Sequence, residues 1–247
     1  MSGEGSRPST LSRLGRAILV LLIAPLSTLY ISLAALFLVH VLRRSSDSCQ
    51  WLARGWGRLI LRAGGVRVTK EGGGDLDPSS SYIFACNHQS QFDIPVLHGF
   101  LGHDFRWLAK KELFQVPIWG AAMRAAGYIA IDRSQGREAL KSLIEAAAEV
   151  AAGKSVVIFP EGTRSPDGRL GEFKAGGMQL AIKAGVPIVP VAIEGTHRVL
   201  PKGKLLVTPG EVTVRVGVPL EVKDCRPREK HDLALQVRAR VADMLGE

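Results

Sequence analysis

Two polar loops that follow apolar segments contain the residue types able to do chemistry. Segment 87–93 reads Asn-His-Gln-Ser-Gln-Phe-Asp and places His88 five residues before Asp93. Five residues correspond to about 140° of rotation on a helix, so the side chains meet only if His88 lies in the loop and Asp93 begins a helix. A carboxylate bonded to one ring nitrogen of a histidine makes the other nitrogen a better base. The pair therefore predicts general-base chemistry, and the alternative is a helix cap beside a core histidine.

The second loop, residues 159–165, reads Phe-Pro-Glu-Gly-Thr-Arg-Ser. Gly162 permits close approach of the backbone, Thr163 offers a hydroxyl, and Arg164 offers a planar fork that suits a phosphate. The loop is no Walker motif, because no Gly-Lys-Ser/Thr follows at the required spacing. It predicts a phosphate-binding loop, with a simple turn and a solvated arginine as the alternative.

Alternating strands and helices are expected to position these loops. Glycines and prolines punctuate the apolar segments throughout residues 66–247. We expect strands at 66–69, 82–86, 128–131, 156–159, 188–193 and 212–216, and helices at 118–126, 134–152, 174–184 and 228–245, with a helical turn at 109–114. This order predicts an α/β fold with a largely parallel central sheet flanked by helices, whose ligands bind at the carboxyl ends of the strands.

An apolar segment precedes the α/β region. Residues 17–42 contain no Asp, Glu, Lys or Arg. This segment is long enough to span a bilayer as one helix kinked at Pro25, or it could enter the bilayer as two shorter segments. Residues 51–62 combine tryptophans with arginines at four-residue spacing, as in an interfacial helix, although a core-facing helix would show the same spacing. We therefore expect a membrane-embedded helical region at 1–65 and the catalytic domain at 66–247.

Charge and cysteine content restrict the partners and the compartment. The net charge of +9 implies an anionic partner, either nucleic acid, an anionic membrane surface or a phosphorylated substrate. Basic residues are denser after the apolar segment than before it, which predicts a cytoplasmic catalytic region. Three cysteines without metal-ligand or redox spacing fit a reducing compartment, and Cys86 is expected to be a buried apolar residue rather than a nucleophile.

Four ordered segments together resemble the 1-acyl-glycerol-3-phosphate acyltransferase family. They are the two loops above, Lys-Lys-Glu-Leu-Phe at 110–114 leading to Ile-Asp-Arg at 131–133, and Val-Pro-Ile-Val-Pro-Val-Ala-Ile at 186–193. The resemblance covers roughly residues 60–220. It implies that His88 removes the proton of a glycerol hydroxyl, that Asp93 orients His88, and that no acyl-enzyme forms. It also implies a substrate-phosphate site made by Glu161, Gly162, Thr163, Arg164 and Lys110.

The resemblance further implies transfer of a fatty acyl group to the sn-2 hydroxyl of 1-acyl-glycerol-3-phosphate, giving phosphatidic acid. The expected co-substrate is acyl-CoA or an acyl carrier protein thioester, with no cofactor and no metal. Expected partners are lysophosphatidic acid and anionic membrane lipids, with no nucleic acid, at the cytoplasmic face of a bacterial inner membrane. Alternative acceptors are glycerol 3-phosphate, another lysophospholipid or an aminolipid, and the other classes considered are a hydrolase and an inactive scaffold.

Overall fold

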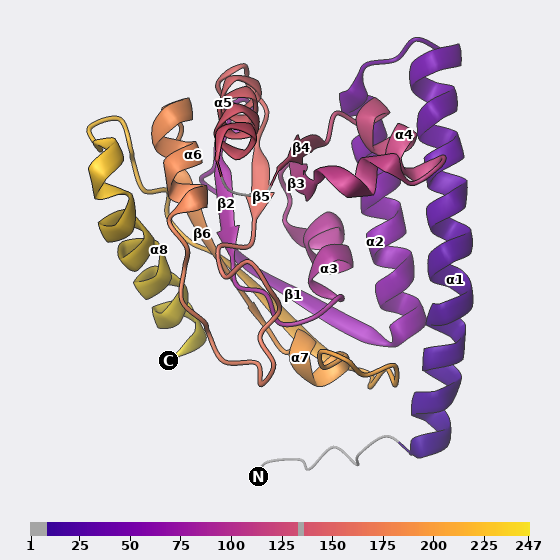
Figure 1. The fold of residues 1–247 in the computed structure, drawn as a ribbon. Helices are drawn as coiled ribbons and strands as arrows, with labels where there is room; N and C mark the ends of the chain where they lie inside the picture. Colours follow the sequence, from indigo (N-terminus) through magenta and orange to yellow (C-terminus); the bar gives the residue numbers. More distant parts are fainter. Residues whose placement is uncertain (1–8, 133–135) are drawn as a thin grey trace.

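A seven-stranded sheet lies at the centre of the computed structural model, which describes residues 9–132 and 136–247. Its spatial order is β1-β7-β6-β2-β5-β3-β4, and every neighbouring pair is parallel except β6 with β7 (Figure 1). The strands are β1 (Val66–Gly72), β2 (Ile83–Cys86), β3 (Arg106–Lys110), β4 (Ile129–Ile131), β5 (Val156–Ile158), β6 (Ile188–Glu194) and β7 (Gly210–Val216). The expected α/β fold with a largely parallel sheet is confirmed.

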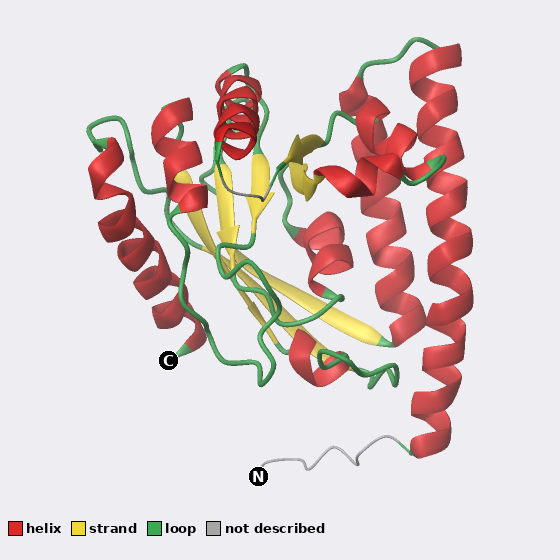
Figure 2. Ribbon diagram, viewed as in Figure 1, coloured by secondary structure: helices red, strands yellow, loops and turns green. Residues whose placement is uncertain are grey.

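Helices cover both faces of this sheet (Figure 2). They are α1 (Thr10–Leu36), α2 (Gln50–Gly64), α3 (Asp93–Phe100), α4 (Trp119–Ala125), α5 (Arg137–Ala151), α6 (Gly176–Ala184), α7 (Thr196–Val199) and α8 (Lys230–Leu245). Strand β2 supplies both cores, because its side chains alternate between the two faces. Ile83 and Ala85 pack with α5, α6 and α8, whereas Phe84 and Cys86 pack with α1, α2 and α3.

Helix α1 is one continuous helix through Pro25, followed by a π-helical turn at Phe37–Val41. Of the two arrangements that the sequence left open, the single helix is therefore present. Helix α1 and this turn together, Thr10–Val41, are long and apolar enough to cross a membrane. One face packs on the domain through Ala17 and Ala35, while the leucines of the other face are exposed along its length.

Helix α2 belongs to the apolar core that includes Phe92 of the 87–93 segment. Ile60 and Leu61 are 4% and 2% exposed and join the apolar cluster of β2 and α3. The predicted division of the chain at residue 65 stays a prediction, but α2 packs as part of the sheet's covering layer.

The contact between α2 and α3 depends on a glycine. A Cβ at Gly57 would lie 2.5 Å from the Pro95 carbonyl oxygen and 2.9 Å from the Gly99 nitrogen, closer than real Cβ atoms approach backbone. Since α3 begins at Asp93, this contact also sets the position of the carboxylate.

We expect Gly57→Ala to lower the free energy of unfolding by about 1–3 kcal/mol, because α3 must move away from α2. Gly55→Ala in the same helix is the matched control, since no atom lies within 4 Å of a Cβ there. The control should raise the free energy by roughly 0.5–1 kcal/mol through helix propensity. Urea unfolding of both variants checks this, and equal effects would contradict the proposed close contact.

Near β3, one sequence-based expectation differs from the structure and one strand was not predicted. The predicted helical turn at 109–114 is a strand end followed by a 3₁₀ helix at Lys111–Gln115, so the expectation was wrong for its first two residues. The strand escaped prediction because Arg106 and Lys110 flank its apolar centre. Arg106 is nevertheless only 3% exposed and pairs with Asp47, which makes its burial possible.

Candidate active site

His88 and Asp93 meet at the carboxyl end of β2. His88 Nδ1 lies 2.7 Å from Asp93 Oδ2, and Asp93 is the first residue of α3, as the spacing required. An ionised carboxylate only accepts hydrogen bonds, so Nδ1 carries the proton and Nε2 is left as the basic atom. The side chain of His88 is 16% exposed and that of Asp93 is 0% exposed. The pair therefore combines a fully buried carboxylate with an imidazole that remains partly accessible.

Asp93 is held by further hydrogen bonds from its own loop and from a distant element. Its Oδ2 also accepts the backbone N–H groups of Gln89 and Ser90, at 2.7 and 2.9 Å. Its Oδ1 accepts the hydroxyl of Thr196 at 2.5 Å. These donors stabilise the buried charge in one orientation. Sequence reasoning missed Thr196, although a polar residue two positions after β6, at the same sheet edge, was an available signal.

Glu161 joins the two predicted loops. Its Oε1 accepts the backbone N–H of His88 at 2.6 Å, and its Oε2 accepts the N–H of Gly171 at 3.1 Å. Burial raises the pKa of this carboxyl above its ordinary value, and the two N–H groups act against that rise. The Ser165 N–H also donates to the His88 carbonyl at 2.7 Å. The backbone of His88 is thus held on both sides by the 159–165 loop, and Glu161 has a structural part in this arrangement. Its predicted contact with a phosphate stays a prediction.

Gly162, Thr163 and Arg164 are the remaining predicted phosphate-binding residues of this loop, and their role stays a prediction. Gly162 has a φ of +77°, which glycine adopts without strain. Within the described residues, the guanidinium of Arg164 has no hydrogen bond or ion pair with another side chain, so its fork is available. Lys202, from the loop after α7, donates to Thr163 Oγ1 at 3.2 Å and to the Arg164 carbonyl at 2.9 Å. No sequence signal pointed to Lys202, because it lies far along the chain from this loop.

Lys110 ends β3, two strands from β2 in the sheet. Its side chain is 55% exposed, and Nζ lies 3.6 Å from Glu112 Oε1. Among the described residues, Glu112 is thus the ion-pair partner of Lys110. Its ligand role therefore stays a prediction.

Aromatic rings support the imidazole of His88. Phe159 stacks on it with ring centroids 3.8 Å apart and an interplanar angle of 11°, and Trp107 stacks on Phe159 at 5.5 Å. Trp107 Nε1 donates to Nε2 of His98, a buried histidine whose pKa burial lowers to about 3, so that it stays neutral. The imidazole of His88 is thus packed against a row of aromatic rings that restricts its rotation.

A largely apolar pocket of about 530 Å³ adjoins the same Phe159. Its walls come from β3, β5, α5 and α6 and include Leu108, Leu140, Leu143, Phe159, Gly162 and Lys174.

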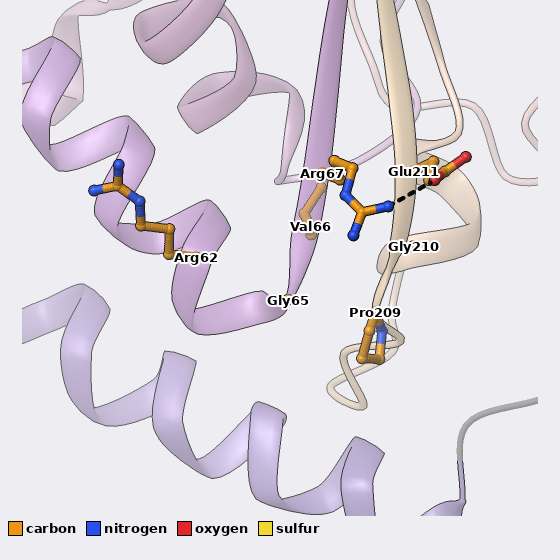
Figure 3. A pocket seen from close by; sticks show the side chains of 7 residues that line it. All are labelled: Arg62, Gly65, Val66, Arg67, Pro209, Gly210 and Glu211. Atoms are coloured by element: carbon orange, nitrogen blue, oxygen red, sulfur yellow. Dashed lines mark hydrogen bonds and ion pairs between the residues drawn. The ribbon is translucent and has the colours of Figure 1, made fainter.

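A second, more open pocket of about 560 Å³ lies where α2 ends and β1 begins. Figure 3 shows Arg67 turned toward Glu211 at its rim, with Arg62 on α2 beyond it. This second pocket contains none of the predicted site residues.

Cys86 is excluded as a nucleophile by its surroundings. It is 0% exposed, and burial, aided by the charge of Asp93, raises its thiol pKa well above the ordinary value. A thiol reacts as the thiolate, so Cys86 is an inert core residue, as expected.

Comparison with known proteins defines the class. The model of the family described as Acyltransferase matches residues 67–194, more than half of the chain, and this range includes both active loops. The chain therefore belongs to the acyltransferase family.

Individual relatives narrow this further. The chain is 34% identical over 192 residues to a 1-acyl-sn-glycerol-3-phosphate acyltransferase of Cocos nucifera, covering 77% of this chain and 62% of that protein. It is 35% identical over 171 residues to the protein of the same name from Pseudomonas aeruginosa, covering 69% and 66%. The matches thus span less than two thirds of these curated relatives. The crystal structure of the 1-acyl-sn-glycerophosphate (LPA) acyltransferase PlsC from Thermotoga maritima has a TM-score of 0.80 and 28% identity, with 96% of this chain and 97% of that chain covered.

Proposed function

We propose that the protein transfers a fatty acyl group from a thioester to the sn-2 hydroxyl of 1-acyl-glycerol-3-phosphate, producing phosphatidic acid. One observation carries this proposal. The His88 backbone is hydrogen-bonded on both sides to the loop that contains Arg164, which supports a general base and a phosphate-binding guanidinium acting in one site. The names of the relatives support the same acceptor.

In the proposed reaction, His88 Nε2 takes the proton of the sn-2 hydroxyl while the hydroxyl oxygen attacks the thioester carbonyl carbon. The carbon–sulfur bond then breaks, and the imidazolium gives its proton to the leaving thiolate. The products are an ester and a free thiol. Asp93 stabilises the imidazolium through Nδ1–H, and Arg164 holds the acceptor's phosphate so that its hydroxyl reaches Nε2.

The donor is proposed to be an acyl-CoA or an acyl carrier protein thioester, used as a co-substrate without any other cofactor. The apolar pocket beside Phe159 supports this, because it offers a fatty chain a place to leave water close to His88. The thioester carbonyl would lie at the mouth of that pocket, within reach of the acceptor hydroxyl.

Association with a membrane is proposed to occur through α1. The exposed apolar face of α1 runs alongside a folded domain, which favours a helix lying in one leaflet with the active loops at the lipid surface. The basic charge excess after α1 supports a cytoplasmic location for the active loops.

The direct test is incubation of the purified full chain with lysophosphatidic acid and each thioester in turn, with the products identified by mass. We expect phosphatidic acid and free thiol in equal amounts. Glycerol 3-phosphate is the comparison acceptor, and its preferential acylation would contradict the proposed acceptor while leaving the acyl transfer itself intact.

Arg164→Lys is expected to raise the KM for lysophosphatidic acid at least tenfold with a smaller change in kcat. Lysine keeps the charge but loses the bidentate fork, and a charged hydrogen bond contributes about 1.5–3 kcal/mol. Arg169→Lys is the control, since this side chain is 86% exposed and lies 4.0 Å from Asp167. A changed KM for the thioester with an unchanged KM for the acceptor would place the phosphate elsewhere.

A further inference from the structure

The loop between α7 and β7, residues 200–209, has an apolar and basic tip. Lys202 and Lys204 are exposed, and the neighbouring Leu205 and Leu206 are 72% and 38% exposed. Leucines beside lysines are the combination with which surface segments enter the interface of an anionic bilayer, because the apolar groups leave water and the cations stay near lipid phosphates.

Folded backbone presents this tip. The Lys204 N–H donates to the Pro201 carbonyl at 3.1 Å, which closes a turn, and the Thr208 N–H donates to the Val199 carbonyl at 2.8 Å, which closes the base of the loop. Val207 is 2% exposed and joins the apolar cluster of the domain. The two leucines are therefore held outward next to a buried anchor.

One side of the loop contacts the candidate active site. Lys202 Nζ donates to Thr163 Oγ1 and to the Arg164 carbonyl, and Ser90 Oγ donates to the Leu200 carbonyl at 2.7 Å. The loop therefore touches both the phosphate loop and the His88 loop, and its tip extends from the rim of the site.

The other end of the loop reaches α1. A Cβ on Gly65 would lie 3.1 Å from Pro209 Cβ and 3.2 Å from Arg16 Cζ, so the loop base and the early turns of α1 meet there. Arg62 and Arg67 lie at the same place, around the open pocket of Figure 3. In Figure 1 the loop accordingly lies beside the amino-terminal half of α1. The tip thus stands between the active loops and the exposed apolar helix, on a basic part of the surface.

From these contacts we infer that the 200–209 loop is a second membrane-contact element, which inserts Leu205 and Leu206 into an anionic lipid surface while Lys202 and Lys204 contact lipid phosphates. Anionic lipid is favoured over a second copy of this chain, because the arginines and lysines around the tip would face one another across such an interface. The inference adds to the membrane role proposed for α1 and does not depend on the acyl-transfer reaction.

Site-specific labelling of the full chain tests this. Leu205→Cys, in a Cys225→Ser background, is labelled with an environment-sensitive fluorophore and mixed with vesicles of phosphatidylglycerol and phosphatidylcholine. Cys49 and Cys86 are buried and do not compete for the label. Leu235→Cys is the matched control, because Leu235 is 67% exposed on α8, across the sheet from α1 (Figure 1).

For vesicle-bound protein, we expect the emission of the label at position 205 to shift to shorter wavelength. Brominated lipids, which quench fluorophores that they contact, should remove most of its emission intensity. The label at 235 should do neither, and vesicles of phosphatidylcholine alone should give a smaller shift at 205. Unshifted emission at 205 in protein that sediments with vesicles would overturn the inference. A concentration-dependent shift without vesicles would also overturn it, in favour of self-association.

Discussion

Replacing His88 with alanine is expected to lower kcat by about 10²–10⁴, with the KM for the acceptor largely unchanged. A hydroxyl is a poor nucleophile at neutral pH, and the base takes its proton only in the transition state, so the loss belongs to kcat. The acceptor's proposed handle, Arg164, belongs to another loop and stays in place. Steady-state kinetics with lysophosphatidic acid as the varied substrate measures both constants.

His231→Ala is the control for this substitution, because it removes an exposed histidine from α8, remote from the active loops. It should leave both constants unchanged. A folded His88→Ala protein that retains more than a few per cent of the parent rate would contradict the general-base mechanism. Circular dichroism of both variants establishes that they are folded.

Asp93→Asn is expected to lower kcat by roughly 10²–10⁴ while the protein stays folded. The asparagine oxygen still accepts the N–H groups of Gln89 and Ser90, and its amide donates to the Thr196 hydroxyl, whose oxygen also accepts. What disappears is the negative charge beside His88 Nδ1, which stabilises the imidazolium. The expected loss is therefore electrostatic rather than structural.

Two further variants separate these causes. Thr196→Val removes one of the hydrogen bonds to the Asp93 carboxylate and keeps its charge beside His88, so it should cost far less rate than Asp93→Asn. The double variant His88→Ala, Asp93→Asn should be little slower than His88→Ala alone, because the two residues act as a unit. Full additivity of the two losses would mean that Asp93 contributes by a route that does not pass through His88.

The strongest sequence signals were those that depend on spacing along the chain. Short apolar segments predicted β2 and β5 to within a residue. Helical periodicity ending at Gly153 predicted α5, although residues 134 and 135 of the predicted 134–152 helix lie outside the described residues. The five-residue separation predicted that Asp93 begins a helix facing His88. These results follow from local geometry, which the chain expresses within a few residues. The order of the strands in the sheet, with β7 antiparallel to β6, depends on long-range packing and was not accessible.

Side-chain direction was the main limit. Glu161 lies in the predicted phosphate loop, and its carboxylate turns inward to two backbone N–H groups, which offset part of the cost of its burial. Thr196 and Lys202 reach the site from elements more than 30 residues further along the chain. Proximity of this kind arises from the fold as a whole, and no spacing rule within one segment reports it.

The double attachment of the His88 backbone to the 159–165 loop has a consequence for engineering. If the 159–165 loop binds the acceptor's phosphate as proposed, acceptor preference cannot be changed independently of the histidine, because the same loop holds the His88 backbone. Grafted loops must therefore keep the carboxylate at position 161 and the backbone N–H at position 165, because both hold the His88 backbone. Variation is best confined to positions 163 and 164, because the hydrogen bonds that hold the His88 backbone come from Glu161 and Ser165 on either side of them.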